Sequence, residues 1–337
     1  MTVWLTGLVI LRSSDLIEES PNQAENTESG TISAVIVTFN PQLQNLRQNI
    51  LAVIDQVDQV VVIDNGSENQ VSLRDLLETL ALEKVVLRCL NVNQGIGAAH
   101  NHGIAIAKES QHDYVLLLDQ DSLVNSDMVD VLYDAVLQLV TSGEASTLAA
   151  VGACYTGDNG NDSFFVRFGW LKFQRQYCLG TEHGVIPADF LISSGSLIPM
   201  KVIDHIGGMD DSLFIDHVDT EWFLRAKAAG LQAYGICQAK MQHGLGEQMH
   251  RVRFLGVARE RHVPQHKPFR YNYMFRNSFA LYRRNNLSRK WKWNDMQRLM
   301  QIFLFYGVCY GPRLQNLTMM FRGMLDGLRN KMGKLPD

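Results

Sequence analysis

The first half of the chain alternates short apolar runs with amphipathic segments, and this alternation limits the possible folds more than any other feature. Each intervening segment carries apolar residues at helical spacing, such as Leu43, Leu46 and Ile50. The runs of strand type occupy residues 31–39, 59–64, 85–90 and 114–118. Strands that alternate with helices form a mostly parallel sheet flanked by helices. We therefore expect an α/β fold with a Rossmann-like central sheet.

The fourth apolar run ends at two carboxylates, Asp119 and Asp121, which are separated by one residue. In α/β sheets, ligands bind beyond the carboxyl ends of the strands. Carboxylate oxygens suit hard cations such as Mg²⁺ or Mn²⁺, and such a cation keeps coordination positions for a diphosphate. The tripeptide thus predicts a divalent-cation site. The alternative is a polar turn in which Asp121 only caps the end of the strand.

A glycine-rich segment, Gly95-Ile-Gly97, opens a predicted helix that runs to about residue 109. A dinucleotide-binding loop would follow the first strand and would carry Gly or Ala where this chain has His100. This segment follows the third strand, which argues against a nicotinamide or flavin site. Glycines at a helix N-terminus also allow the backbone to approach a phosphate or a sugar closely.

Composition excludes several classes of protein. An apolar content of 46% and a charged content of 20% fit a globular chain of 337 residues with a sizeable core. A net charge of −4 gives no reason to expect nucleic acid as a partner. Five cysteines without CxxC spacing favour a reducing compartment over a disulfide framework. No apolar run reaches the ~18 residues of a membrane span, and residues 3–11 lack the basic start of a signal peptide.

The remaining segments divide the chain into three parts. Residues 1–30 are predicted to form a flexible leader, because most of them are polar. Strands are expected at 149–155, 189–199 and 232–237, and a helix at 216–229. Residues 156–187 show little periodicity and are interpreted as a loop near an acceptor, or alternatively as a surface insertion. From residue 269 onward, aromatic and basic residues mix in helical patterns. There Arg276 and Arg283 are expected on a solvated helix face, with contacts to phosphates as the alternative.

Several short motifs occur in the order and at the spacing of a known family. They are Thr38-Phe39-Asn40, Val62-Ile63-Asp64-Asn65-Gly66-Ser67, Asn93-Gln94-Gly95-Ile96-Gly97, Asn101-His102-Gly103 and Asp119-Gln120-Asp121. Together they resemble an inverting glycosyltransferase of family 2 with a GT-A fold, over about residues 31–285. The later segments 207–210 and 214–222 are similar to the acceptor-side motif of its rhamnosyltransferase branch. That branch uses dTDP-L-rhamnose to build bacterial polysaccharides such as the O antigen of lipopolysaccharide.

The resemblance implies roles for particular residues. The residues that it assigns to the donor nucleotide are Thr38, Phe39, Asn40, Asp64, Asn93, Gly95, Gly97, Asn101 and Asp119. It implies a Mg²⁺ or Mn²⁺ cofactor bound directly by Asp121, with Asp119 and His243 as further candidate ligands.

The catalytic base is expected in a region where Asp210, Asp216, Asp219 and Glu221 crowd together. In many relatives two acids stand side by side and the second is the base, whereas here His217 takes the second position. We predict Asp216 as the base, with Asp219 second. His217 is the alternative, although nearby negative charge should keep it protonated. The other alternative is that Asp216 only caps the helix.

The predicted function is metal-dependent transfer of L-rhamnose from dTDP-L-rhamnose to a saccharide or lipid-linked acceptor. The first alternative is the same fold with a UDP-hexose or galactofuranose donor, and the second is a non-catalytic sugar-binding assembly subunit. We expect a GT-A domain over residues 31–268 and a helical C-terminal extension over 269–337.

Basic, aromatic-rich helices suit a membrane interface. We therefore expect a cytoplasmic protein attached peripherally to the inner face of the bacterial membrane, unless these helices form a homo-oligomer contact instead. The residues expected at the membrane are Lys290, Trp291, Lys292, Trp293, Arg298, Phe303, Phe305, Arg313, Phe321, Arg322, Arg329 and Lys331.

Overall fold

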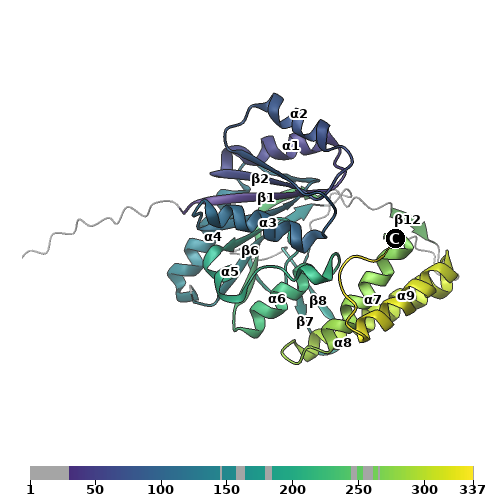
Figure 1. Ribbon diagram of the computed structural model, residues 1–337. Helices are drawn as coiled ribbons and strands as arrows, with labels where there is room; N and C mark the ends of the chain where they lie inside the picture. The colour runs from purple at the N-terminus through teal and green to yellow at the C-terminus, as the bar shows by residue number, and fades with distance from the viewer. Residues whose placement is uncertain are drawn as a thin grey trace, which may run out of the picture.

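The computed structural model describes residues 30–144, 146–156, 164–178, 184–243, 249–252, 261–264 and 266–336. The predicted leader therefore lies outside the described residues, apart from Gly30. The described chain forms a mixed α/β fold around one large sheet, with a group of helices at its C-terminal end (Figure 1). The predicted fold class is confirmed.

The first half of the sheet consists of four parallel strands. They are β1 (Ile32–Thr38), β2 (Gln59–Asp64), β3 (Val85–Cys89) and β4 (Tyr114–Asp119), in the spatial order β3-β2-β1-β4. The connecting helices are α1 (Leu43–Val53), α2 (Gln70–Leu80) and α3 (Ile96–Glu109). All seven elements agree with the sequence analysis to within a few residues, because each buries an apolar run or stripe against the sheet.

The second half of the sheet mixes directions and continues in the order β4-β10-β6-β11-β5. Its strands are β5 (Ser122–Val124), β6 (Leu148–Thr156), β9 (Val185–Ala188), β10 (Ser196–Pro199) and β11 (Gln232–His243), and β9 also pairs with β11. The strand predicted at 189–199 is too long, because Gly195 adopts φ +81° and turns the chain before Ser196. The strand predicted at 232–237 is too short, since its pairing with β6 and β5 continues to His243.

Helices cover both faces of the sheet. On one face, α3, α5 (Met200–Ile206) and α6 (Val218–Ala228) pack over the apolar side chains of one core cluster. On the other face, α1, α2 and α4 (Met128–Leu139) pack over a second cluster. A short 3₁₀ turn, Asp211–Leu213, links α5 to α6. Both faces are thus closed to water, which leaves the strand ends as the place for ligands.

The predicted loop over residues 156–187 is wrong where the structure describes it. β7 (Phe164–Phe168) and β8 (Phe173–Tyr177) form an antiparallel hairpin beside the sheet (Figure 1). Phe168 packs into a cluster with Leu281 and Trp291 of the C-terminal helices. These partners are more than 100 residues away, so local periodicity gave no sign of them.

One disulfide joins the hairpin segment to the sheet. Cys178 and Cys237 are bonded, with their Cα atoms 5.5 Å apart. The sequence favoured a reducing compartment over a disulfide framework, and this bond removes the support that the cysteines gave to that preference.

The C-terminal region is helical, as predicted. It comprises α7 (Pro268–Tyr282), α8 (Arg289–Ile302), a π-helical turn (Phe303–Cys309) and α9 (Arg313–Leu328). These helices share a core of their own around Tyr271, Phe275 and Met320, and Figure 1 shows them together at one end of the molecule. In the described part of the chain, no helix is both long and apolar enough to cross a bilayer.

Three residues predicted at a membrane are used inside the protein instead. Trp291 is buried in the cluster with Phe168, and the ammonium group of Lys292 donates to the carbonyl oxygens of Tyr282 and Arg284. Arg298 pairs with the buried Asp295. The expectation of a solvated helix face is also wrong for Arg276, which is buried and donates to the carbonyl oxygen of Leu213 at 2.9 Å.

Candidate active site

The carboxyl ends of β1 and β2 hold a buried carboxylate, Asp64. It accepts hydrogen bonds from the Thr38 hydroxyl (3.1 Å), from the Ser67 hydroxyl and backbone N–H, and from the Gln70 amide (2.7 Å). These four bonds fill the acceptor capacity of a carboxylate. Asp64 and Thr38 therefore fix the turn that follows β2, next to the end of β1.

Beside this turn, the two residues after β1 remain accessible. The Phe39 backbone N–H donates to the side-chain oxygen of Gln120 (2.8 Å), and the Phe39 ring is 44% exposed. Asn40 adopts φ 47° and accepts from the backbone of Glu68 (2.8 Å). An aromatic face and a polar loop at a strand end are suited to stack and orient a planar base.

The glycine-rich start of α3 is covered by protein. A Cβ atom at Gly95 would lie 2.5 Å from the carbonyl oxygen of Phe214, and one at Gly97 would lie 3.1 Å from that of Asp210. Asn93 binds the N–H of Gly95 (2.9 Å) and so fixes the turn that leads into the helix. Their contact with the donor stays a prediction. In the structure, Gly95 and Gly97 also permit the close approach of the 210–214 segment.

Asn101, one turn further along α3, also serves this support. Its amide donates to the carbonyl oxygen of Met209 (2.9 Å) and accepts from the Met209 N–H (2.8 Å). Both polar atoms of the side chain are thus engaged within the protein. Asn101 thus clamps the segment before the acidic cluster, and its contact with the donor stays a prediction.

Asp119 ends β4 and Asp121 follows two residues later, so this acidic pair lies at the carboxyl end of the parallel strands, which we call the acidic edge. Asp119 pairs in register with Val37 of β1, and its N–H donates to the Ser194 hydroxyl (3.1 Å). Ser194 also shares a hydrogen bond with Ser122 (2.6 Å), the residue after Asp121. The 193–195 turn therefore holds the Asp119–Ser122 segment in place through these hydrogen bonds.

The residues around Asp121 fit a hard divalent cation by the chemistry of their donor atoms. Asp119 and Asp121 are partly exposed, and the backbone of His243 pairs with that of Ser122. No group of three or more potential ligands is gathered among the described residues. Mg²⁺ is commonly bound through one or two carboxylates together with substrate phosphates, so two aspartates suffice for that mode of binding.

A strained loop leads into α6. Phe214, Asp216 and His217 have φ values of 66°, 63° and 64°. Each such residue costs of order 1–3 kcal/mol, and this kind of strain is concentrated at functional sites. We call residues 213–217 the strained loop.

A single side chain from α7 holds the strained loop. The amide of the buried Asn277 donates to the carbonyl oxygens of Leu213 (3.0 Å), Ile215 (2.8 Å) and Asp216 (2.9 Å). The N–H of Ile96 holds the loop from the opposite side by donating to Phe214 (2.7 Å). The C-terminal helices therefore help to build the site.

Two of the four candidate acids are engaged in ion pairs that support the fold. Arg284 bridges Asp210 and Glu221, and Arg225 also pairs with Glu221 at 3.0 Å. Burial alone would raise the pKa of Asp210, but hydrogen bonds from Ser212 and Arg284 lower it overall. Asp210 and Glu221 are thus ill suited to accept a proton.

Asp216 forms an ion pair with Arg270. The Arg270 Nε lies 3.3 Å from both carboxylate oxygens of Asp216, and a second guanidinium nitrogen lies 3.3 Å from one of them. No side-chain hydrogen bond caps α6, whose N-cap residue is His217. Capping therefore does not explain Asp216, and its carboxylate is aimed at α7.

Asp219 has a different environment. Burial raises the pKa of its carboxyl group, and hydrogen bonds from Thr220 and from the backbone of Ser193 offset part of that effect. The bond from the Thr220 N–H is 2.6 Å long. A carboxylate with a raised pKa is a stronger base, and its contact with Ser193 connects it to the turn that braces the Asp119–Ser122 segment.

His217 is directed into the protein. Burial lowers its pKa, and its Nε2 accepts from Arg298 at 2.9 Å. The same nitrogen lies 2.9 Å from the Ser278 hydroxyl and 3.8 Å from Asp295. The expectation of a protonated His217 assumed a diphosphate beside it; within the protein alone, burial outweighs the nearby acids and lowers the pKa of the ring. In a neutral ring the Nε2 lone pair is already engaged by Arg298, so it is not available to take the proton from the hydroxyl group of a sugar acceptor.

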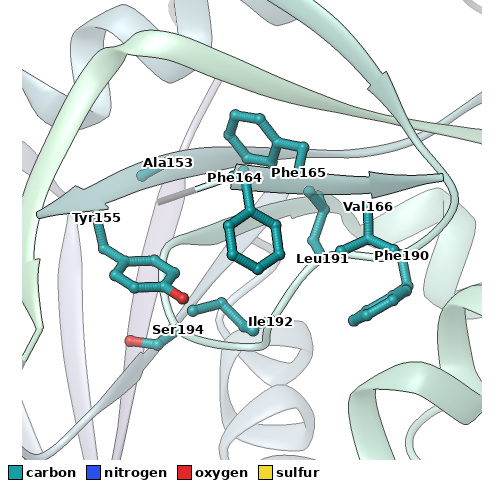
Figure 2. A pocket seen from close by; sticks show the side chains of 10 residues that line it. Ala153, Tyr155, Phe164, Phe165, Val166, Phe190, Leu191, Ile192 and Ser194 are labelled. Atoms are coloured by element: carbon teal, nitrogen blue, oxygen red, sulfur yellow. The ribbon is translucent and has the colours of Figure 1, made fainter. Parts of the chain in front are cut away.

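Two cavities flank the segment between Phe190 and Ser194. The first, of about 180 Å³, is lined mainly by Phe164, Phe165, Phe190 and Leu191, and Figure 2 shows the hydroxyl groups of Tyr155 and Ser194 at one end. The second, of about 210 Å³, is lined by Phe190, Asp216, His217 and Thr220 among others. The first cavity reaches Ser194, which bonds to the Asp119–Ser122 segment, and the second is lined by Asp216 and His217 of the strained loop. Phe190 lines both cavities.

The tight hold on the strained loop leads to a prediction. Asn277→Ala will lower the free energy of unfolding by about 1–3 kcal/mol, because it leaves two buried carbonyl groups without this donor, while Leu213 keeps Arg276. Turnover per folded molecule will fall at least tenfold as the loop relaxes. Denaturant unfolding and turnover, measured on one preparation, check both results. Asn286→Ala, at an exposed position after α7, is the matched control and should change neither. Unchanged turnover in the Asn277 variant would show that the strained geometry is not needed.

The structure and its site have counterparts among known proteins. A solved structure, the crystal structure of GalNAc-T7 with UDP, GalNAc and Mn²⁺, superposes with a TM-score of 0.54 at 16% identity. The match covers 65% of this chain and 44% of that one, so this chain spans less than half of that structure. This neighbour and the sheet described above define a fold of the GT-A type.

Sequence comparison gives the family. Residues 33–198 match the family described as glycosyl transferase family 2. The dTDP-rhamnosyl transferase RfbF of Shigella flexneri is 33% identical over 261 residues, which is 77% of this chain and 82% of that protein. The chain belongs to glycosyl transferase family 2 and is a glycosyltransferase, as the sequence motifs predicted.

Several residues of the site escaped the sequence analysis. Arg270, Asn277 and Arg284 lie more than 50 residues from the acids or loop that they contact. Ser194, which bonds to Asp119 and Ser122 at the end of β4, was not among the predicted site residues. The sequence of α7 shows arginine and asparagine residues among aromatic residues at helical spacing. Only the fold shows which residues the arginine and asparagine side chains bind.

Proposed function

We propose that this enzyme transfers L-rhamnose from dTDP-L-rhamnose to a hydroxyl group of a saccharide acceptor. The observation that carries the proposal is the link between Asp219 and the Asp119–Ser122 segment through Ser193 and Ser194. This link connects Asp219, a carboxylate whose pKa is raised, to Asp119 and Asp121, which are suited to bind a cation, within one site. The similarity to a protein named dTDP-rhamnosyl transferase supports this choice of donor.

The cavity beside the acidic edge favours a 6-deoxy sugar over a hexose. Its lining is mainly aromatic and aliphatic, and its hydroxyl groups lie at one end (Figure 2). Rhamnose carries a methyl group where a hexose carries a CH₂OH group, so its C5–C6 edge would lose no hydrogen bonds in an apolar cavity. A hexose or galactofuranose donor would bury a hydroxyl group without a partner, which costs about 1–3 kcal/mol. These donors remain the first alternative.

The proposed reaction is an in-line displacement at the anomeric carbon. Asp219 accepts the proton of the acceptor hydroxyl as its oxygen forms a bond to that carbon, while the bond to the dTDP oxygen breaks. The configuration inverts, so a β-linked donor gives an α-linked product. The ranking of Asp219 above Asp216 reverses the order expected from the sequence, since Arg270 occupies both oxygens of Asp216. We assign Asp216 to orienting the acceptor.

The donor would lie along the carboxyl ends of β1, β2 and β4. We propose that Phe39 and Asn40 contact the thymine and that Thr38 and Asp64 fix the loop around it. Asp121, with Asp119 and His243, would hold a Mg²⁺ or Mn²⁺ ion, which when bound would neutralise the charge of the leaving diphosphate. Asn93, Gly95, Gly97 and Asn101 would act through the 209–214 segment that they support.

We also propose an acceptor and a location. A lipid-linked saccharide used in O-antigen synthesis would place the enzyme at the inner face of the bacterial membrane, attached peripherally. The domain limits, a GT-A domain over 31–268 with a helical extension over 269–337, also remain proposals. The close contact of α7 with the strained loop argues that the extension belongs to the catalytic unit.

A donor assay tests the proposal. We expect purified enzyme with Mg²⁺ or Mn²⁺ to release dTDP from dTDP-L-rhamnose in the presence of a saccharide acceptor. UDP-glucose, UDP-galactose and UDP-galactofuranose should react at least tenfold more slowly. Faster turnover of one of these donors would move the assignment to the first alternative. If the enzyme binds a donor and releases no product with any acceptor tried, the non-catalytic assembly subunit becomes the better description.

A further inference from the structure

Outside the active site, the β7–β8 hairpin presents two large apolar side chains to solvent at its tip. Trp170 and Leu171 are 78% and 77% exposed. Burying such side chains elsewhere in the fold would be favourable, so their exposure as a neighbouring pair marks an interaction surface.

The exposed tip is held in place by α8. Asn294 donates to the carbonyl oxygen of Gly169 (2.8 Å), and Gln297 donates to that of Leu171 (2.7 Å). The Lys290 ammonium group lies 4.7 Å from the centre of the Trp170 ring. These contacts fix the backbone of the turn while Trp170 and Leu171 point outward.

One face of α8 continues the apolar surface. Trp293, Met296 and Met300 are spaced by three and four residues, so they share a helix face, and all three are exposed. We call Trp170, Leu171, Trp293, Met296 and Met300 the tip surface. Trp at a boundary with water is typical of membrane interfaces, where one side of the ring is apolar and the other is wet.

A cationic groove adjoins the tip surface. It has a volume of about 900 Å³ and is lined by Trp170, Trp293 and four basic residues, namely Arg167, Lys227, Arg289 and Lys290. Asp189 is the one acid among the described residues that line it, and it is paired with Lys227. The groove therefore carries an excess of positive charge next to the apolar tip.

From this juxtaposition we propose that the tip surface and its groove dock on a bilayer of anionic phospholipids. Trp170, Leu171 and Trp293 enter the interface, and Arg289 and Lys290 contact the phosphate groups. Charge complementarity selects this occupant over a neutral surface, since each basic residue near anionic lipid strengthens binding about fivefold. The surface shares Lys290 and Trp293 with the residues expected at the membrane from the sequence and adds the tip of the hairpin. Its binding does not require the proposed rhamnosyl transfer.

Vesicle sedimentation of the full-length protein tests the docking surface. At low salt, the protein should sediment with vesicles of phosphatidylglycerol and phosphatidylethanolamine and should remain soluble with vesicles of phosphatidylcholine. The triple variant Trp170→Ser, Leu171→Ser, Trp293→Ser should bind at least about tenfold more weakly. Val71→Ser with Val92→Ser removes two other exposed apolar residues and should leave binding unchanged. The pair Arg289→Gln and Lys290→Gln should weaken binding and flatten its dependence on salt.

Three outcomes would overturn the proposal. The first is a wild-type protein that does not bind anionic vesicles, and the second is a triple variant that binds them as well as the wild type does. The third is a wild-type protein that is dimeric in solution while the triple variant is monomeric. The last result would identify the tip surface as a contact between copies of the chain. Turnover with a water-soluble acceptor is measured on the same variants and should not change. Failure of that turnover in the wild type would count against the proposed reaction alone.

Discussion

Asp219→Asn will lower turnover by two to four orders of magnitude and will leave donor binding intact. General-base catalysis contributes on that scale, and asparagine keeps the shape of the side chain without accepting a proton. Asn can still accept the hydrogen bond that the Thr220 N–H now gives to Asp219 at 2.6 Å. The measurements are single-turnover rates with dTDP-L-rhamnose and the dissociation constant of dTDP, which reports on a separate part of the site.

The same variant should be at least as stable as the wild type at neutral pH. Burial raises the pKa of Asp219 in the folded state above its value in the unfolded chain. Ionisation therefore favours unfolding, and the folded protein loses stability as pH rises from the unfolded pKa through the folded pKa. The neutral Asn residue escapes that loss. A gain or no change in Tm together with a large loss of turnover distinguishes a catalytic role from a structural one.

The pH profile gives a further check on the assignment. If Asp219 must be ionised to act, kcat falls on the acid side with an apparent pKa above the ordinary value for aspartate, and this limb disappears in Asp219→Asn. Asp211→Asn, at an exposed acid of the same region, is the control and should keep both turnover and profile. A dead Asp216→Asn beside an active Asp219→Asn would return the base to Asp216, as the sequence first suggested.

The parts of the fold that the sequence predicted are those governed by local periodicity. β1, β2, β3 and β4 follow directly from apolar runs, and α1 to α3 follow from apolar stripes on one face. The end of β4 also marks the acidic edge, because the change from Leu118 to Asp119 is a change from buried to partly exposed within one residue. Position at a strand end was enough to locate that part of the site.

The parts that the sequence did not predict depend on contacts between distant segments. The glycines of α3 were interpreted as making room for a ligand, yet the room is filled by the backbone of Phe214, more than 110 residues later. The φ values of 63° at Asp216 and 64° at His217 could not be inferred, since neither residue is a glycine. Asn277 makes this geometry possible, and no local pattern connects it to the strained loop.

The choice of base shows the same limit in chemical terms. The sequence offered four candidates among the five acids of residues 210–221, and a family precedent for two acids side by side. Three arginines then distinguish these acids by ion pairing. Arg284 pairs with Asp210 and Glu221, Arg225 pairs with Glu221, and Arg270 pairs with Asp216. Burial, in contrast, raises the pKa of Asp219, and the fold determines both this burial and the positions of those cations.

Asp121→Ala will abolish transfer, and EDTA will do the same to the wild type. Asp121 follows the last residue of β4 by two positions, at the open edge where the backbone of His243 pairs with Ser122. A carboxylate there is placed to hold a divalent cation against the leaving diphosphate, and loss of that charge should slow the reaction by at least three orders of magnitude, or about 4 kcal/mol of barrier. Restoring Mg²⁺ or Mn²⁺ should rescue the chelated wild type and leave the variant inactive.

A binding measurement separates this role from a general loss of structure. Titration of Mn²⁺ in the presence of dTDP, followed by the electron paramagnetic resonance signal of the free ion, should show one bound ion in the wild type and weakened binding in Asp121→Ala. Asp134→Ala, an exposed acid on α4, serves as the control and should bind and turn over normally. Because two protein carboxylates and the substrate phosphates are expected to share the ion, binding without dTDP should be weak. Full activity after exhaustive chelation, or unchanged Mn²⁺ binding in the variant, would remove the cation from the site and leave Asp121 as a residue of the turn after β4.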